Sequence, residues 1–300
     1  MNFIEENFVS WAQGPSKTES EKCKNSENTI RKAIAADSDL AKLDITVFAQ
    51  GSYKARTNIR QNSDVDICVR YNGAFFTEYP DGKSKEDFGN VDGKLPFADY
   101  KDMVGRALRS YFGVSSVTRG NKAFDIHANT YRVDADVVPT FEHRRYTGQK
   151  TSDASDVFLS GVAFNPDSGG LIKNWPQQNY DNGVAKNSEA GRRYKRVIRI
   201  LKRLRDRMQE DRVPEANDVA SFLIECLVWN APVEAFQHDT YSADLRYVVA
   251  DIWNRTRKDE DCLEWGEVNE LKYLFCSTQS WSRPQANNFL QAVWDYVGFK

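Results

Sequence analysis

The sequence is poor in the residues that hold zinc or build disulfide frameworks. Its five cysteines are widely separated, without a Cys-x2-Cys pair, and its three histidines stand alone. These residues are Cys23, Cys68, Cys226, Cys262, Cys276, His127, His143 and His238. Zinc sites need clustered ligands, so the pattern gives no support for a zinc module, and we expect each histidine to be structural. An odd number of unclustered cysteines is typical of reduced thiols, and we expect a cytoplasmic protein.

Long apolar runs and an excess of one charge are also missing. No run approaches the roughly 18 apolar residues of a membrane-spanning helix, so we expect no membrane partner. The N-terminal stretch MNFIEENFVSWAQG is acidic and lacks the apolar block of a signal peptide. With 41 Lys and Arg against 43 Asp and Glu, the net charge of −2 argues against a surface built to coat nucleic acid.

The first half of the chain is rich in predicted strands. A capping-box spacing at Ser16–Glu19 predicts a helix to about Ala36, and Asp37-Ser38-Asp39 is interpreted as the turn after it. The other elements predicted here are strands at 45–49, 64–70, 114–119, 123–128 and 131–139, a long loop or insertion at 72–98, and a helix at 99–112. Pro139 is expected to end the last strand, since proline cannot donate to a ladder.

The second half is predicted to be helical. Turn-forming residues dominate 142–190, with few periodic segments. Helical periodicity then predicts helices at 191–210, 217–230, 242–257, 264–275 and 284–296. Strands followed by helices indicate the α+β class. The 300 residues correspond to about two domains, and we expect lobes at 1–165 and 166–300.

The strongest chemical signal is the pair Asp64 and Asp66 on one predicted strand. Residues i and i+2 of a strand face the same way, so both carboxylates project from one face while Val65, Ile67 and Val69 enter the core. Adjacent carboxylates repel each other unless a cation lies between them, and Mg²⁺ prefers such hard oxygen ligands. A solvated strand face is the alternative for any bare Asp-x-Asp.

Two neighbouring features favour the metal site. Gly51-Ser52 lies at a strand-to-turn junction shortly before the pair, where the backbone can approach a phosphate and the amides and the Ser52 hydroxyl can donate to it. The predicted strand at 131–139 carries Asp134 and Asp136 on the face opposite its apolar residues. A third carboxylate from this strand would complete a two-metal site for in-line attack at phosphorus.

A basic segment in the helical half offers a partner for phosphate. Nine of the sixteen residues from Arg192 to Arg207 are Lys or Arg, and Lys195, Arg199 and Lys202 share one helix face at spacing i, i+4, i+7. That face is predicted to hold a triphosphate, and a solvated basic face is the alternative. The apolar stripe of the same helix comprises Val197, Ile200, Leu201, Leu204 and Met208.

The motif Gly51-Ser52-x4-Thr57-x2-Arg60-x2-Ser63-Asp64-x-Asp66 resembles that of nucleotidyltransferases related to oligoadenylate synthetase and cyclic GMP–AMP synthase. The stretches QGSYKARTNIRQNSDVDICVR and ADVVPTFEHRRY are most similar to the bacterial cGAS/DncV-like nucleotidyltransferases, the CD-NTases. This resemblance implies a bilobed, polymerase-β-like nucleotidyltransferase fold of the α+β class. Its parts would be a mixed-sheet catalytic lobe with N-terminal helices and a helical nucleotide-binding lobe with a long spine helix.

The resemblance also implies roles for single residues. The third carboxylate of the family precedes an apolar-apolar-Pro segment, which Asp136 and the following Val-Val-Pro match, so Asp136 is chosen over Asp134. Asp64, Asp66 and Asp136 would then hold two Mg²⁺ ions, which Mn²⁺ can replace. Asn187 is a hypothetical base reader, and Arg199 with Lys202 matches the family's Arg-x-x-Lys phosphate contacts. The predicted nucleotide-binding residues are Gln50, Gly51, Ser52, Asn187, Lys195, Arg199, Lys202 and Ser221.

The implied activity is synthesis of a cyclic di- or trinucleotide from NTPs, with release of pyrophosphate, as a signal in bacterial anti-phage (CBASS) defence. A downstream effector would bind the product, and accessory regulators are further implied partners. The DNA-sensing zinc module of cyclic GMP–AMP synthase is not expected, because cysteine and histidine are unclustered. Two alternatives stay open: a template-independent RNA nucleotidyltransferase, and a non-catalytic nucleotide-binding module of the same fold.

Overall fold

The computed structural model describes residues 3–59 and 64–300, and its contacts divide the chain into two compact units. The sheet unit contains the described residues of 17–53 and 63–177, and the helical unit contains those of 1–16, 54–62 and 178–300. This division differs from the expected boundary at 165/166, because the chain adds one more strand to the sheet before it leaves that unit. The first sixteen residues, expected in the catalytic lobe, belong to the helical unit.

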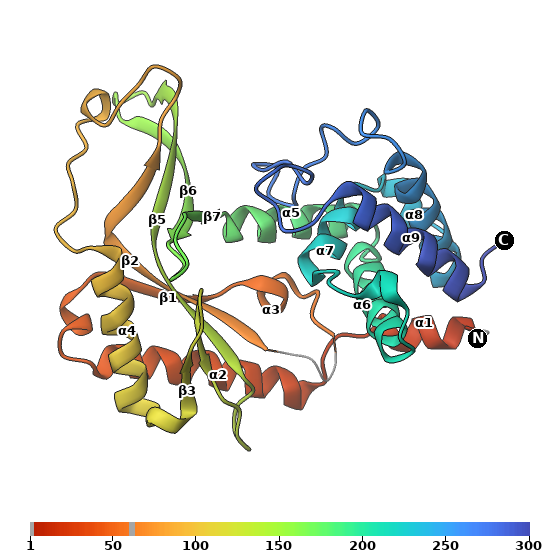
Figure 1. Cartoon of the computed structure of the whole chain (residues 1–300), viewed down its shortest axis with the longest axis horizontal. Coiled ribbons are helices and arrows are strands. Elements are labelled where there is room, and N and C mark those ends of the chain that lie inside the picture. The colour runs from red at the N-terminus through yellow and green to blue at the C-terminus, as the bar shows by residue number, and fades with distance from the viewer. Residues whose placement is uncertain (1–2, 60–63) are drawn as a thin grey trace. The chain divides into compact units, whose positions relative to one another are not determined.

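Among the described residues, the sheet unit contains seven strands. They are β1 (Ile45–Ala49), β2 (Val65–Glu78), β3 (Val117–Arg119), β4 (Phe124–Ile126), β5 (Ala135–Lys150), β6 (Asp156–Phe164) and β7 (Ile172–Asn174). Five of them lie in the order β1-β2-β5-β4-β3, and β6 and β7 continue the sheet along the distal part of β5 (Figure 1). β2 and β5 run parallel, whereas β1–β2, β3–β4, β4–β5, β5–β6 and β6–β7 are antiparallel.

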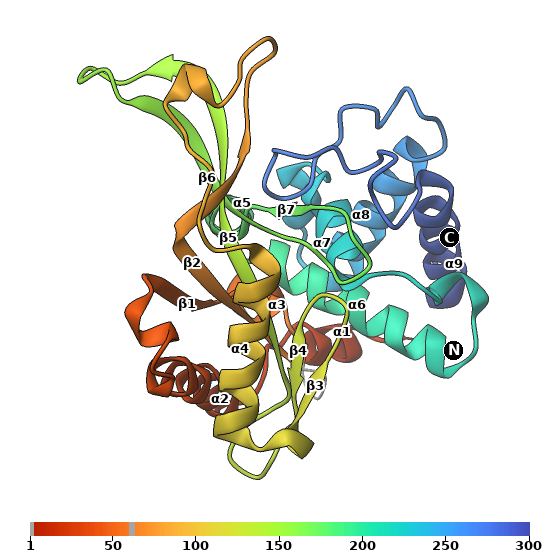
Figure 2. The same cartoon turned by 60° about the vertical axis from the view of Figure 1, so that its left-hand side comes forward.

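The core of the sheet unit lies between one face of the sheet and the helices α2 (Lys17–Ala36) and α4 (Phe97–Phe112). Val65, Ile67 and Val69 of β2 are fully buried there, as predicted, together with alternate residues of β5. Figures 1 and 2 show α2 and α4 against this part of the sheet. Since successive strand residues point to opposite faces, the polar residues between the buried ones face away from these helices.

Two strands extend farther than predicted. β2 continues to Glu78, so the expected loop at 72–98 begins with strand. β5 passes through Pro139 to Lys150, and the predicted strand end at this proline was wrong. Pro139 lies between the part of β5 that pairs with β4 and the part that pairs with β6, where a missing N–H costs these antiparallel ladders nothing. The region expected to hold mainly turns instead contains the rest of β5, then β6, β7 and helix α5 (Pro176–Glu189).

Helices dominate the helical unit. Besides most of α5, the described residues include α1 (Glu5–Trp11), α6 (Tyr194–Glu210), α7 (Ser221–Trp229), α8 (Tyr241–Arg255) and α9 (Arg283–Val297). The last four confirm four of the five helices predicted after residue 190. The short helix α3 (Gly51–Ala55) follows β1. Within the described part of the chain, no helix combines the length and apolar character needed to cross a membrane.

The helix predicted at 264–275 was wrong. Gly266 and Tyr273 form an antiparallel bridge there, and the buried Asn269 donates a hydrogen bond to the Glu267 carboxylate at 2.7 Å. The side-chain oxygen of Asn269 also accepts a hydrogen bond from the Leu271 amide at 2.7 Å. Such local bonds between side chains and backbone offer the chain an alternative to helical pairing, which explains the failure of the periodicity rule.

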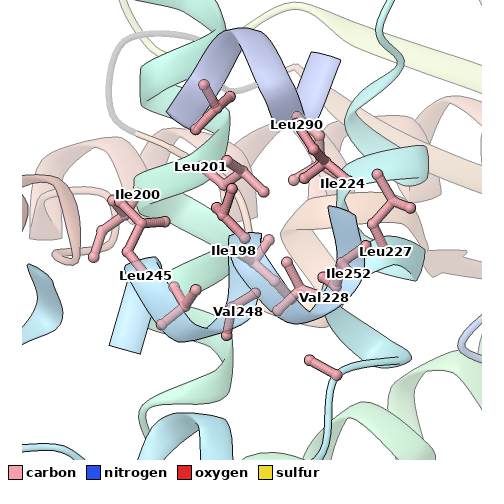
Figure 3. Close-up of a cluster of buried hydrophobic side chains, with 14 of the residues drawn as sticks. Ile198, Ile200, Leu201, Ile224, Leu227, Val228, Leu245, Val248, Ile252 and Leu290 are labelled. Carbon is pink, nitrogen blue, oxygen red and sulfur yellow. The ribbon is translucent and has the colours of Figure 1, made fainter. Parts of the chain in front are cut away.

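α6 lies at the centre of the helical unit's core. Its predicted apolar stripe is confirmed, since Val197, Ile200, Leu201, Leu204 and Met208 are all fully buried. Figure 3 shows the side chains of α6 among those of α7, α8 and α9, with Ile224 and Leu290 beside Leu201. Full burial of one such side chain contributes roughly 1.5–3 kcal/mol, so the five residues of this stripe together contribute substantially to the stability of the unit.

One carboxylate ties α1 to α8. Glu5 accepts hydrogen bonds from the backbone amides of Tyr241 (2.6 Å) and Ser242 (2.8 Å). These amides belong to the first turn of α8, where N–H groups lack partners within the helix and a negative charge is favourable. Glu5 therefore acts as a helix cap supplied from a distant part of the sequence.

We predict that Glu5→Ala lowers the free energy of unfolding by about 1–2 kcal/mol, the range typical of a lost helix cap. Glu6→Ala, at the exposed neighbouring position, is the control and should change it by less than about 0.5 kcal/mol. Urea unfolding followed by circular dichroism measures both variants. Equal effects of the two substitutions would contradict the capping role.

Candidate active site

Two of the predicted carboxylates are direct neighbours across the parallel pair of strands. The register of β2 and β5 places Asp66 opposite Asp136. Both residues alternate with buried apolar residues, so they lie on the face of the sheet that α2 and α4 leave free. Asp64 immediately precedes β2 and is exposed. The structure therefore makes neighbours of the two strands from which the sequence drew the three carboxylates.

A further carboxylate, Asp125, belongs to the same row and was missed from the sequence. β4 pairs with β5 so that Asp125 lies opposite Asp136 on the side away from Asp66. The strand itself was predicted, but its partner was not. The available signal was the apolar–polar–apolar pattern of Phe124, Asp125 and Ile126, which places Asp125 alone on the polar face.

Asp134 has a different environment from Asp136. Its carboxylate accepts a hydrogen bond from the Ala128 amide at 2.6 Å, and its carbonyl oxygen accepts one from the Val65 amide at 3.1 Å. Asp134 therefore holds the loop between β4 and β5 and the start of β2. This geometry is consistent with the choice of Asp136 over Asp134 for the third carboxylate position.

Two carboxyl groups in this part of the sheet, those of Asp136 and Asp64, have raised pKa values. Burial, followed by the charges of Asp66, Asp125 and Asp64, raises the pKa of Asp136 to about 7, and a side-chain hydrogen bond with Asp125 adds to the shift. Burial and then the charge of Asp134 raise the pKa of Asp64 as well. Both shifts have the same two physical causes: burial disfavours the charged form of each carboxyl group, and the negative charges of neighbouring carboxylates add to the shift.

The donor set fits divalent metal ions with a preference for hard oxygen ligands. Carboxylates whose charges are mutually uncompensated gain most from a bound cation, and Mg²⁺ is usually held by one or two carboxylates together with substrate phosphates. Within residues 3–59 and 64–300, no group of three or more acidic, histidine or cysteine side chains is arranged so that it could by itself hold a metal ion.

The turn after β1 approaches the carboxylate row closely. The Gln50 amide donates to the Asp66 carbonyl oxygen at 2.8 Å, which extends the β1–β2 pairing by one residue. Gly51 has φ of +62°, and a Cβ placed on it would overlap the Asp66 carboxylate. Ser52 follows in the first turn of α3. Glycine is therefore required here for close approach to Asp66, as well as for its left-handed backbone. Arg60 and Ser63 of the motif lie outside the described residues.

The predicted basic face of α6 is not solvated. Lys195 and Lys202 are 7% and 2% exposed, and Arg199 is partly buried. Lys202 donates to the Glu225 carboxylate at 2.6 Å, and Arg199 donates through Nε to the Ala12 carbonyl oxygen at 2.7 Å. Burial, and then the Arg56 charge, lower the pKa of Lys195 to about 8, and its ammonium lies 5.7 Å from the centre of the Tyr180 ring.

The other two predicted nucleotide-binding residues also have protein partners. The Asn187 side-chain oxygen accepts from the Lys195 amide at 3.1 Å, next to the start of α6. The Ser221 hydroxyl accepts from Arg205 at 3.0 Å at the start of α7. Asn187 thus supports the entry into α6, and Ser221 is bound to a mostly buried guanidinium.

The chain is similar over its whole length to known cyclic nucleotide synthases. It is 39% identical to the cyclic dipyrimidine nucleotide synthase CdnE of Cecembia lonarensis over 99% of both chains. Against the enzyme of the same name from Legionella pneumophila the identity is 40%, over 98% of this chain and 97% of the relative. Residues 181–298 match the family model described as the cGAS/DncV-like nucleotidyltransferase C-terminal helical domain. The structure of the Elizabethkingia meningoseptica CdnE cyclic dinucleotide synthase with GTP and Apcpp is similar, with a TM-score of 0.81 and 34% identity over 99% of this chain and 100% of that chain.

These similarities first define the class: the chain is a nucleotidyltransferase with a mixed-sheet unit and a C-terminal helical domain. It belongs to the cGAS/DncV-like nucleotidyltransferase (CD-NTase) family, within the CdnE clade of cyclic nucleotide synthases. The predicted family resemblance and the predicted polymerase-β-like α+β fold are thereby confirmed.

We predict that Gly51→Ala lowers the rate of pyrophosphate release by at least about 100-fold, because even small misplacement of reacting groups has effects of this size. The new methyl group would displace the Asp66 carboxylate. Gly89→Ala is a matched control, since Gly89 also has φ of +62° but no atom within 4 Å of a built Cβ. Both variants carry the same backbone strain of roughly 1–2 kcal/mol. Similar rates for the two variants would show that the contact with Asp66 does not matter.

We predict a pH-dependent stabilisation by Mg²⁺. Because the pKa of Asp136 is raised to about 7, the folded protein binds more protons than the unfolded chain between about pH 4 and pH 7. The metal-free protein should therefore lose stability as the pH rises through this window. Mg²⁺ should raise the melting temperature more at pH 8 than at pH 5, where protons compete for the carboxylates. Equal shifts at both pH values, or an undiminished difference in Asp136→Asn, would contradict this site.

Proposed function

We propose that this enzyme joins two NTPs into a cyclic dinucleotide that contains at least one pyrimidine base. The observation that carries the proposal is the row Asp66, Asp136 and Asp125 beside the Gly51 turn, in a chain similar along its full length to CdnE synthases. The identities of 39% and 40% to two cyclic dipyrimidine nucleotide synthases favour pyrimidine. The similar Elizabethkingia enzyme was solved with GTP and Apcpp, so the base has to be tested directly.

In the proposed site, Asp64, Asp66 and Asp136 would hold the divalent ions. Bound Mg²⁺ neutralises phosphate charge and lowers the pKa of an attacking hydroxyl. The carboxylates have to be ionised for this role, and their mutual repulsion favours binding of any cation. No histidine or cysteine nucleophile is required for phosphoryl transfer of this kind.

The chain's own contribution to the reaction is positioning. The amides after Gln50 and the Ser52 hydroxyl would donate to the donor triphosphate at the start of α3, where Gly51 allows close approach. A ribose hydroxyl oxygen of the acceptor attacks the α-phosphorus, the bond to pyrophosphate breaks, and the hydroxyl proton leaves with a nearby base or water. A second transfer within the linear intermediate closes the ring and releases a second pyrophosphate.

Lys195 is the member of the basic face that we propose for triphosphate binding. Burial and the Arg56 charge lower the pKa of this lysine to about 8, and the charge of Glu225 offsets them only in part. A phosphate oxygen would supply that charge. Lys54, at the end of α3, lies against the same Tyr180 ring at 4.7 Å. We also propose that the product serves a downstream effector in anti-phage (CBASS) signalling, as the family resemblance implies.

The test is incubation of the enzyme with an equimolar NTP mixture and Mg²⁺, with and without RNA, followed by mass spectrometry. We expect a phosphatase-resistant cyclic dinucleotide and two pyrophosphates per product, without extension of the RNA. Asp64→Asn/Asp66→Asn and Asp136→Asn should each reduce product by at least about 1000-fold, as expected when catalytic groups act as a unit. Asp134→Asn, which loses part of one backbone contact, should reduce it by less than about tenfold.

Three results would count against all or part of the proposal. Wild-type product yield from the Asp64→Asn/Asp66→Asn variant would remove the metal-ligand role of these carboxylates. Elongated RNA instead of small cyclic products would identify the enzyme as a terminal nucleotidyltransferase. A cyclic product made only of purines would retain the activity but overturn the assignment of the base.

A further inference from the structure

One face of helix α5 follows the side chain of Lys195 from its backbone to its charged end. The side-chain oxygen of Asn187 accepts a hydrogen bond from the Lys195 amide at 3.1 Å. A Cβ built on the buried Gly183 would lie 3.9 Å from Lys195 Cε, an ordinary van der Waals contact. The Lys195 ammonium lies 5.7 Å from the centre of the Tyr180 ring. Residues at spacing i, i+3, i+7 share one face of a helix, so a single face of α5 supports this lysine.

α5 is itself held in place on another part of its surface. Asn182 donates to the Val268 carbonyl oxygen at 2.8 Å, and Lys186 donates to the Ala231 carbonyl oxygen at 2.6 Å. Both bonds lie within the helical unit. The Tyr180 ring therefore belongs to a helix that is fixed on either side of Gly183, and it can act as a rigid support for a flexible lysine.

A second lysine directs its ammonium to the same ring. Lys54 Nζ lies 4.7 Å from the centre of the Tyr180 ring, within the roughly 6 Å over which an aromatic face attracts a cation. Lys54 belongs to the helical unit, as Tyr180 and Lys195 do. It lies in α3, two residues after Ser52. Tyr180 is therefore shared by two lysines that come from different helices.

The protein supplies little negative charge to these two lysines. Between the described residues, neither Lys54 nor Lys195 forms an ion pair, and neither ammonium takes part in a hydrogen bond. Lys195 is only 7% exposed, and the positive charge of Arg56 acts on it as well. The charge of Glu225 offsets these effects in part, but that carboxylate is already bound to Lys202. A bound anion would stabilise both ammonium groups.

We infer that Tyr180 is a positioning residue that holds Lys54 and Lys195 toward the phosphate chain of the NTP, and that Lys54 is a ligand of this chain beside Lys195. The inference rests on the proposed nucleotidyl transfer and deepens its account of triphosphate binding. A phosphate chain carries several negative charges in a row, so it can pair with two ammonium groups at one ring. Lysine side chains that a ring already orders lose less freedom when they bind, which raises affinity.

The first test removes the ring. We expect Tyr180→Leu to raise the calorimetric Kd of inorganic tripolyphosphate and of a non-hydrolysable UTP analogue, each with Mg²⁺, by the same factor of roughly 5- to 50-fold, because two lysines then have to be ordered on binding. Tyr180→Phe keeps the aromatic face and should stay within about threefold of the wild type. Tyr247→Leu is the matched control in the same unit. The Tyr247 ring contacts His238, and its loss should change neither Kd.

The second test asks whether Tyr180 acts through the lysines. Lys54→Met and Lys195→Met should each raise both Kd values by about 10- to 100-fold, the loss typical of one charge-assisted contact. In the Lys54→Met/Lys195→Met background, Tyr180→Leu should add less than about twofold, because the groups that the ring positions are gone. A purely structural role of Tyr180 would give the same added loss in both backgrounds, and that result would overturn the inference.

Three further results would overturn it. The first is a Tyr180→Leu effect on the UTP analogue but not on tripolyphosphate, which would place the ring against the base. The second is wild-type affinity in Tyr180→Leu. The third is wild-type affinity in Lys54→Met, which gives an answer at a partly exposed position even if Tyr180→Leu does not fold. If the wild-type enzyme makes no cyclic product, the proposed function fails, and tripolyphosphate binding still judges the roles of Tyr180 and Lys54.

Discussion

The parallel pairing of β2 with β5 is the constraint on which the rest of the site depends. It sets Asp66 beside Asp136 at the spacing of neighbouring strands, about 4.7–4.9 Å. Burial and electrostatic repulsion both oppose the charged form of these carboxylates, and together they raise the pKa of Asp136 to about 7. Hydrophobic burial enforces it, because a shift of the register by one residue would move the fully buried Val65, Ile67 and Val69 to the polar face. The hydrophobic core thus keeps the carboxylates close together, and a bound cation would offset their repulsion.

The turn after β1 also contacts β2, at Asp66. Gly51 approaches Asp66 so closely that any side chain would overlap the carboxylate. The Gln50 amide is bonded to the Asp66 carbonyl oxygen, so the turn and the carboxylate move as one piece. A phosphate group bound at the start of α3 would therefore lie at a defined position relative to Asp66, without any contribution from long side chains. Preorganisation of this kind is what transfer between phosphates requires, since the protein itself supplies little covalent chemistry.

Many of the correct predictions came from local periodicity. The failures arose mainly where segments that are distant in the sequence pair or pack together. The burial of Val65, Ile67 and Val69 and the apolar stripe of α6 follow from periods of two and 3.6 residues, and both were predicted. Asp125 was missed because its importance arises only when β4 pairs with β5. Helix α5 was missed because its sequence is rich in Asn, Gln and Asp. It is supported from outside, by Lys186 bound to the Ala231 carbonyl oxygen and Asn182 bound to that of Val268.

The basic helix shows why charge counted along a sequence is a poor guide to ligand binding. Arg205 donates to the Val219 carbonyl oxygen at 2.8 Å and to the Ser221 hydroxyl, and Lys202 is bound to Glu225. These cations supply hydrogen-bond partners for polar groups that would otherwise be buried without any. Leaving such groups unpaired would destabilise the fold. Of the nine cations on this segment, Lys202 and Arg205 are therefore occupied by partners inside the protein, whereas Arg192 and Arg207 are exposed. Burial lowers the pKa of two cations on this face of α6, Lys195 to about 8 and Arg199 to about 10, and a bound anion would favour the charged form of either. Arg199 already donates to the Ala12 and Arg56 carbonyl oxygens, which is why Lys195 is the cation proposed here for the phosphate.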